Sequence, residues 1–274
     1  MNKKLVVIVA ALIMAAIALP YPALAQQNDS NAAAVEKKPA ATTEEKAKSV
    51  AEGRTKKMLD GLGVTDAAKE AKAREVMVAY FEKVELFQAK NKADIKELWT
   101  QWSATRNERD ANEKDPAKIK MVQGKITAAA DKVTSAYAEL KPAHMALLAD
   151  LGKVLTAEQI DAIKDKLTVN KVKVTFNAYC QIFPGLTDPQ KAHIMESLKA
   201  AREEAMDAGT MDEKSAFFKM YKDKVEAYLT DQGYNVRQSY KDFSAKQKAE
   251  KAAKEAAASK PASAPAKPAP TGGG

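Results

Sequence analysis

Cysteine and histidine are scarce in this sequence. Its 274 residues include one cysteine, Cys180, and two histidines, His144 and His193. One cysteine cannot form an internal disulfide, and its place in the apolar string YCQIF predicts a buried thiol. Zinc sites typically need four Cys, His or carboxylate ligands. His193 shares a helix face with Glu196, but no matching pair occurs elsewhere, so we expect solvated residues there and no metal site.

Motifs for nucleotide binding and for common nucleophilic catalysis are absent. The sequence contains no GxxxxGKS/T, GxGxxG or GxSxG pattern. Four acidic residues could supply the paired carboxylates of a glycosidase: Glu196, Glu203, Glu204 and Asp207. They lie in a run of mixed charge, which is typical of a solvated helix face. We therefore expect no catalytic residue and no cofactor, and keep a carboxylate enzyme as an alternative.

Long apolar runs are confined to the N-terminus. Lys3 and Lys4 precede an apolar run of about fifteen residues, and Ala23-Leu24-Ala25 fits the small-x-small cleavage pattern. The run is shorter than the roughly 20 residues that a membrane-spanning helix needs. The sequence predicts a signal peptide over residues 1–25 and export to the periplasm or the extracellular space, with no membrane span after cleavage. An N-terminal anchor helix is the alternative.

Positive charge is concentrated at the two ends of the chain. The net charge is +8, and removing the signal peptide takes away Lys3 and Lys4 and no acid, which leaves +6. From Lys246 onward the chain has six lysines and two glutamates, so only +2 remains for the body. The six arginines are scattered, whereas nucleic-acid-binding surfaces concentrate basic residues. We therefore expect no nucleic-acid partner.

Glycine and proline are rare in the middle of the chain, which is rich in good helix formers. Apolar residues recur there at spacings of three and four, which predicts amphipathic helices. We predict an all-α bundle of about six helices over residues 44–245, in which Trp99 and Trp102 belong to the core. A polar linker over residues 26–43 precedes it, and a low-complexity tail over residues 246–274 follows.

Three strings predict helix starts by their capping-box form, in which a Thr and a Gln or Glu three residues later bond to each other's backbone. The Thr residues are Thr156, Thr187 and Thr210. At the second string, Asp188 as the cap before Pro189 is an equally good interpretation. Residues 169–183 fit both a strand and a helix, and we predict an extended start followed by a helix.

Several blocks in a fixed order carry a resemblance. They read GVTD from Gly63, LTAEQ from Leu155, KVTFNAY from Lys173, IFPGLTDPQK from Ile182, AREEAMDAG from Ala201 and FFKMYK from Phe217. Together they resemble a family of secreted bacterial proteins of unknown function to which sugar binding has been ascribed. The resemblance implies an exported helical domain and brings no catalytic residues. The LTxxQ strings alone are similar to a five-residue motif of periplasmic helical chaperones.

Ligand-binding candidates come from the aromatic and charged residues of these blocks. Aromatic rings can stack on the apolar faces of sugars, and tyrosine adds a hydrogen-bonding tip. The candidates are Tyr179, Arg202, Glu203, Asp207, Tyr221 and Tyr228. We predict a non-enzymatic exported protein that binds carbohydrate or a cell-envelope polymer. A periplasmic chaperone or envelope-stress factor is the first alternative, and a carboxylate enzyme is the second. The sequence leaves the oligomeric state open.

Overall fold

Helices make up nearly all of the structure. The computed structural model describes residues 41–111 and 116–258, and these residues contain no strand. The prediction of an all-α fold is therefore confirmed. The predicted signal peptide, nearly all of the predicted linker and the end of the predicted tail lie outside the described residues.

The described residues form more helices than the six or so predicted. They are α1 (Thr43–Leu59), α2 (Ala67–Ala111), α3 (Pro116–Ala136), the 3-10 turn η2 (Tyr137–Leu140), α4 (Lys141–Leu151), α5 (Ala157–Leu167), α6 (Lys171–Ile182), α7 (Asp188–Met206), α8 (Met211–Asp231) and α9 (Val236–Ala258). The predicted number of helices was too low because tight turns divide the chain into several short helices. Pro142, for example, lies in the first turn of α4, directly after the 3-10 turn that follows α3, and proline cannot continue a preceding helix.

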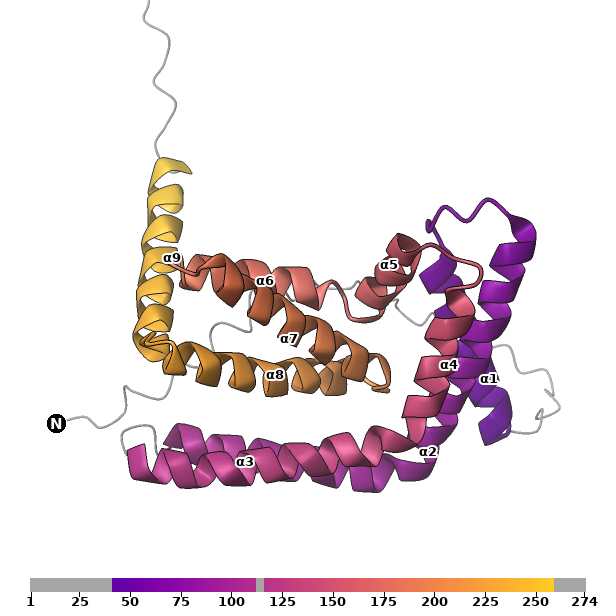
Figure 1. Cartoon of the computed structure of the whole chain (residues 1–274), viewed down its shortest axis with the longest axis horizontal. Coiled ribbons are helices and arrows are strands. Elements are labelled where there is room, and N and C mark those ends of the chain that lie inside the picture. Colours follow the sequence, from indigo (N-terminus) through magenta and orange to yellow (C-terminus); the bar gives the residue numbers. More distant parts are fainter. Residues whose placement is uncertain (1–40, 112–115, 259–274) are drawn as a thin grey trace, which may run out of the picture. The chain divides into compact units, whose positions relative to one another are not determined.

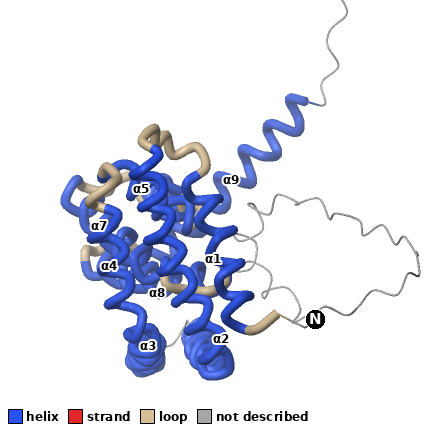
Figure 2. Tube along the Cα trace, turned by 90° about the vertical axis from the view of Figure 1, so that its right-hand side faces the viewer, coloured by secondary structure: helices blue, strands red, loops and turns tan. Residues whose placement is uncertain are grey.

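The long helix α2 connects the other helices of the N-terminal half. At 1.5 Å per residue, the path along its 45 residues is about 67 Å long. Figure 1 shows α3 lying along α2, and Lys125 of α3 pairs there with Glu108 of α2 at 2.8 Å. On the other half of α2, Arg54 of α1 pairs with Glu85 at 2.9 Å. Figure 2 shows α1, α2 and α4 side by side.

Large aromatic side chains join α8 to this half. Trp99 and Trp102 of α2 are 9% and 2% exposed, so their predicted place in the core is confirmed. The Phe217 ring of α8 packs edge-on against Trp99, with centroids 5.0 Å apart, and against Tyr137 at 5.1 Å. The quadrupoles of the rings favour edge-to-face contacts of this kind, and the contacts also bury apolar surface area. The core is therefore continuous from α2 to α8.

All three predicted capping boxes are present. Thr156, Thr187 and Thr210 each accept a hydrogen bond from the backbone of the residue three positions later, and that residue's side chain bonds back to the cap. Thr187, rather than Asp188, is the N-cap of α7. These local motifs fix where α5, α7 and α8 begin.

The start of α6 differs from the prediction. Val169 and Asn170 have positive φ angles of 48° and 56°, so they form a tight left-handed turn rather than an extended segment. The Asn170 amide donates to the Asp165 carbonyl at 2.8 Å, and the Val169 amide donates to the Lys166 carbonyl at 3.3 Å. This pair of bonds is the Schellman ending of a helix, which requires the left-handed conformation.

Cys180 is also placed differently from the prediction. Its neighbour Tyr179 is 1% exposed, whereas Cys180 is only partly buried. Successive helical residues are turned by about 100°, so the face that buries Tyr179 leaves the next side chain at its edge.

The last helix, α9, packs through its first half. Tyr240 donates to Glu226 of α8 at 2.8 Å, whereas residues 245–255 are exposed. Among the described residues, no helix combines the length and the apolarity that crossing a bilayer requires.

Replacing Phe217 with alanine tests the packing of α8. We expect Phe217→Ala to lower the free energy of unfolding by about 3–5 kcal/mol, because it removes a buried ring and leaves a cavity. Met211→Ala on the same helix is the control. Its side chain is 46% exposed, so its effect should stay within about 0.5 kcal/mol. Urea unfolding followed by circular dichroism measures both, and equal losses would contradict this packing.

Candidate functional site

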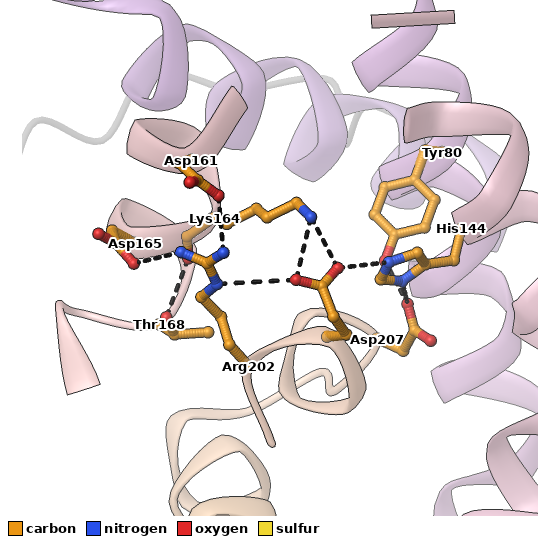
Figure 3. Close-up of polar contacts among 9 residues, drawn as sticks. Tyr80, His144, Asp161, Lys164, Asp165, Thr168, Arg202 and Asp207 are labelled. Atoms are coloured by element: carbon orange, nitrogen blue, oxygen red, sulfur yellow. Dashed lines mark hydrogen bonds and ion pairs between the residues drawn. The ribbon is translucent and has the colours of Figure 1, made fainter. Parts of the chain in front are cut away.

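Three of the six candidate residues lie close together at the C-terminal end of α7, where they join a chain of polar contacts (Figure 3). Asp207 accepts a hydrogen bond from the Tyr80 hydroxyl of α2. The same carboxylate oxygen contacts His144 Nδ1 of α4 at 2.8 Å. His144 Nε2 contacts Glu203 at 3.3 Å, and Lys164 of α5 donates to both oxygens of Glu203 at 2.9 and 3.0 Å. Four helices therefore meet through charged or polar side chains.

The charged groups in this series of polar contacts stabilise one another. Burial lowers the pKa of His144, but hydrogen bonds to Asp207 and Glu203 outweigh burial and raise the pKa to about 9. Burial likewise raises the pKa of Glu203, but hydrogen bonds from His144 and Lys164 outweigh it and lower the pKa to about 2. His144 is therefore a cation at neutral pH, held between two carboxylates. Burial and the Asp207 charge raise the pKa of Tyr80, so its hydroxyl keeps its proton.

Arg202 forms the other end of the cluster. Arg202 is only 5% exposed. Its two terminal nitrogens donate to Asp165 at 2.8 Å and to Asp161 at 2.7 Å, and both carboxylates belong to α5. A buried guanidinium needs such partners, because an unpaired charge is costly away from water. Arg202 Nε lies 3.7 Å from Glu203, so the two clusters are continuous.

This arrangement favours a structural role over proton transfer. A general acid of a glycosidase needs a carboxyl group with a raised pKa, whereas the pKa of Glu203 is lowered. A general base must be able to take a proton, whereas both nitrogens of His144 face carboxylates. Within the described ranges, no three Cys, His, Asp or Glu side chains are placed to hold a metal ion.

A second set of ion pairs joins α8 to α2. Asp223 of α8 is 7% exposed and accepts from Arg106 Nε at 2.8 Å and from Arg109 Nη1 at 3.0 Å. At the start of α8, Glu213 accepts from the Gly209 amide at 2.9 Å and from the Tyr137 hydroxyl at 3.1 Å. The orientation of α8 is thereby fixed at its start and near its middle.

Two further candidates, Tyr221 and Tyr228, lie where α8 meets α7. The Tyr228 ring lies against His193 of α7, with centroids 3.9 Å apart and planes tilted by 31°. The Tyr221 hydroxyl donates to Glu204 of α7 at 3.0 Å, and Lys224 lies over the Tyr221 ring at 4.3 Å. We call His193, Glu204, Tyr221, Lys224 and Tyr228 the α7–α8 aromatic surface. Both tyrosines are half-buried, while His193 and Lys224 are exposed.

The last candidate, Tyr179, lies in the core. Its ring stacks on Phe183 at 6.0 Å, and its hydroxyl donates to the Lys222 carbonyl at 3.5 Å. The six candidates therefore do not line one concave site. The structure has a cleft between the α1–α2 and α4–α5 loops and another beside α2 and η2, and none of the six residues lines either cleft.

Sequence reasoning missed several residues of the polar chain, namely Tyr80, His144 and Lys164. They lie on three different helices, far in sequence from their α7 partners: Tyr80 is 127 positions from Asp207, His144 is 59 from Glu203, and Lys164 is 39 from Glu203. No local spacing therefore connects them. One signal was present for His144. It shares a helical stripe with Leu147 and Leu151, and a polar residue on such a buried face requires a polar partner.

The pH dependence of stability tests the charge on His144. The histidine pKa is about 6.5 when unfolded and about 9 in the fold, so its stabilising contribution is complete below pH 6.5 and is lost as the pH rises to 9. We expect the wild-type free energy of unfolding to fall more steeply between pH 6 and pH 9.5 than that of His144→Gln. Urea titrations at both pH values measure the difference, and the variant comparison removes the contributions of other groups. Parallel pH dependences in the two proteins would contradict a cationic His144.

Comparison with known proteins adds a family. A search of curated proteins finds no match. A family described as a protein of unknown function, DUF3826, matches residues 47–249, which include every helix from α2 to α8 and more than half of the chain. The predicted resemblance to a family of unknown function agrees with this match. The chain belongs to the DUF3826 family of proteins of unknown function.

Proposed function

We propose that this protein is exported, is not an enzyme, and binds carbohydrate or a cell-envelope polymer through the α7–α8 aromatic surface. The observation that carries the proposal is the pair of half-buried tyrosine rings, Tyr221 and Tyr228, at the junction of two helices. Export rests on the signal-peptide pattern over residues 1–25.

The spacing of the two rings suits an extended ligand. Tyr221 and Tyr228 are seven residues apart, so they project from nearly the same side of α8, roughly 10 Å apart along its axis. Their partners on α7, Glu204 and His193, are also on one side of that helix, because eleven residues are about three turns. A polymer lying along this junction would meet two rings in succession, with charged groups beside them.

The ion pairs that join α7 to α4 and α5 support binding rather than catalysis. Arg202, Glu203 and Asp207 are engaged with α5, α4 and α2, so they hold α7 in place and leave α7 residues on the other side for α8 and solvent. A fixed surface suits polymer binding, because less ordering is needed when the ligand arrives. On this proposal the three residues position the binding surface instead of touching the ligand.

The chaperone alternative has less support. A client-binding chaperone needs a broad exposed apolar face. The large exposed apolar side chains among the described residues are spread over many elements: Val50, Met121, Met145, Val169, Val174 and Met211. Scattered residues of this kind are normal on a protein surface.

Binding of polysaccharides by tyrosine variants tests the proposal. We expect the full chain to retain at least one glycan on an array of polysaccharides. We expect Tyr221→Ala and Tyr228→Ala each to weaken that binding roughly 2- to 10-fold, since aromatic stacking contributes about 0.5–1.5 kcal/mol. Tyr221→Phe should bind nearly as well as the wild type, because it keeps the ring.

Met145→Ala is the matched surface control, because Met145 is 71% exposed on α4. Its binding should be unchanged, and thermal melting of each variant checks that folding is intact. A wild-type chain that retains no glycan, or an equal loss in the Met145 variant, would overturn the proposal.

A further inference from the structure

A cleft of about 310 Å³ lies between the α1–α2 loop and the α4–α5 loop, and no residue of the α7–α8 aromatic surface lines it. The two walls are tied together through Gln159. Its side-chain amide donates to the Leu62 carbonyl at 3.4 Å, and its oxygen accepts from the Thr156 amide at 3.0 Å. The two walls of the cleft are therefore joined by a hydrogen bond within the protein itself.

The lining combines an apolar floor with a polar rim. Val64, Val154 and Leu155 supply the apolar side chains, and Leu155 is 7% exposed, so it forms part of the core beneath. Thr65, Asp66 and Lys69 are exposed along one wall. Ligand sites of proteins typically combine apolar walls with a few polar groups that fix orientation. This lining suits a small molecule that has one apolar face and polar groups around its edge.

The charge of the rim points to an anionic group on that molecule. Asp66 Oδ1 accepts from the backbone amides of Ala68 and Lys69 at 2.9 and 3.1 Å, so the start of α2 is already capped by the protein. The Lys69 ammonium has no hydrogen-bond or ion-pair partner among the described residues. Lys153 on the opposite wall is paired with Asp150 at 2.6 Å. Of the two lysines that line the cleft among the described residues, Lys69 is the one without an ion-pair partner.

We propose that this cleft binds a sugar acid, that is, a small hydroxylated carboxylate. The apolar face of the ring lies on Val64 and Leu155, and the carboxylate pairs with Lys69. The hydroxyl groups bond to the Thr65 hydroxyl and to the Asp66 carboxylate. This site shares no residue with the α7–α8 aromatic surface, so either site can fail its test while the other stands.

Nuclear magnetic resonance titration of the full chain tests the site, with D-glucuronate as the probe and D-glucose as the matched neutral compound. We expect glucuronate to shift the amide signals of residues 63–69 and 153–159, and glucose to bind more weakly. Lys69→Gln should weaken glucuronate binding at least about fivefold, because it removes a charge-assisted hydrogen bond.

Lys72→Gln is the matched control. Lys72 is an exposed lysine one turn further along α2 and pairs with Glu75 at 2.9 Å, so its loss should leave glucuronate binding unchanged. Three results would overturn the proposal: no shifts in the two loops, equal affinity for glucose and glucuronate, or equal affinity of the Lys69 variant and the wild type.

Discussion

The contact between His144 and the carboxylates of α7 is the constraint on which the rest of this structure depends. The chain has one cysteine, so no internal disulfide can join its N-terminal and C-terminal helices. They are joined instead by apolar packing and by charges taken out of water. A cationic histidine lies between Asp207 and Glu203. The Tyr80 hydroxyl donates to the same Asp207 oxygen that His144 contacts, and Lys164 donates to both oxygens of Glu203. Removing His144 would leave the buried Asp207 carboxylate without its ion-pair partner, which is strongly destabilising.

The contacts of α7 with α4 and α5 also determine which α7 side chains face α8. Side chains three or four positions apart share a helix face, so holding Arg202, Glu203 and Asp207 against α5 and α4 sets the rotation of α7. With α7 fixed, His193 and Glu204 face the tyrosines of α8. Asp223 of α8 is in turn held by Arg106 and Arg109 of α2. Arg202, Glu203 and Asp207 of α7 thus hold the helices together, and the binding surface that we propose is formed by other residues of α7 and α8.

Local features were predictable from the sequence, and contacts across the fold were not. Thr156, Thr187 and Thr210 cap helices because the partner of each is three residues away. The left-handed turn at Val169 was missed because a β-branched residue seldom adopts it, and the bonds that enforce it come from the preceding helix. The His144 cluster was missed because its members come from separate helices. Charge in the run around Arg202 suggested a solvated face, whereas its partners on α5 bury it.

A double-mutant cycle on His144 and Asp207 tests the central claim most directly. Urea unfolding at pH 6 would be measured for the wild type, His144→Ala, Asp207→Asn and the double variant. If the contact joins α4 to α7 as described, the two substitutions will be non-additive, with a coupling free energy of about 1–3 kcal/mol that favours the wild-type pair. Additive losses, within about 0.5 kcal/mol, would show that the contact contributes nothing of its own and would contradict the account.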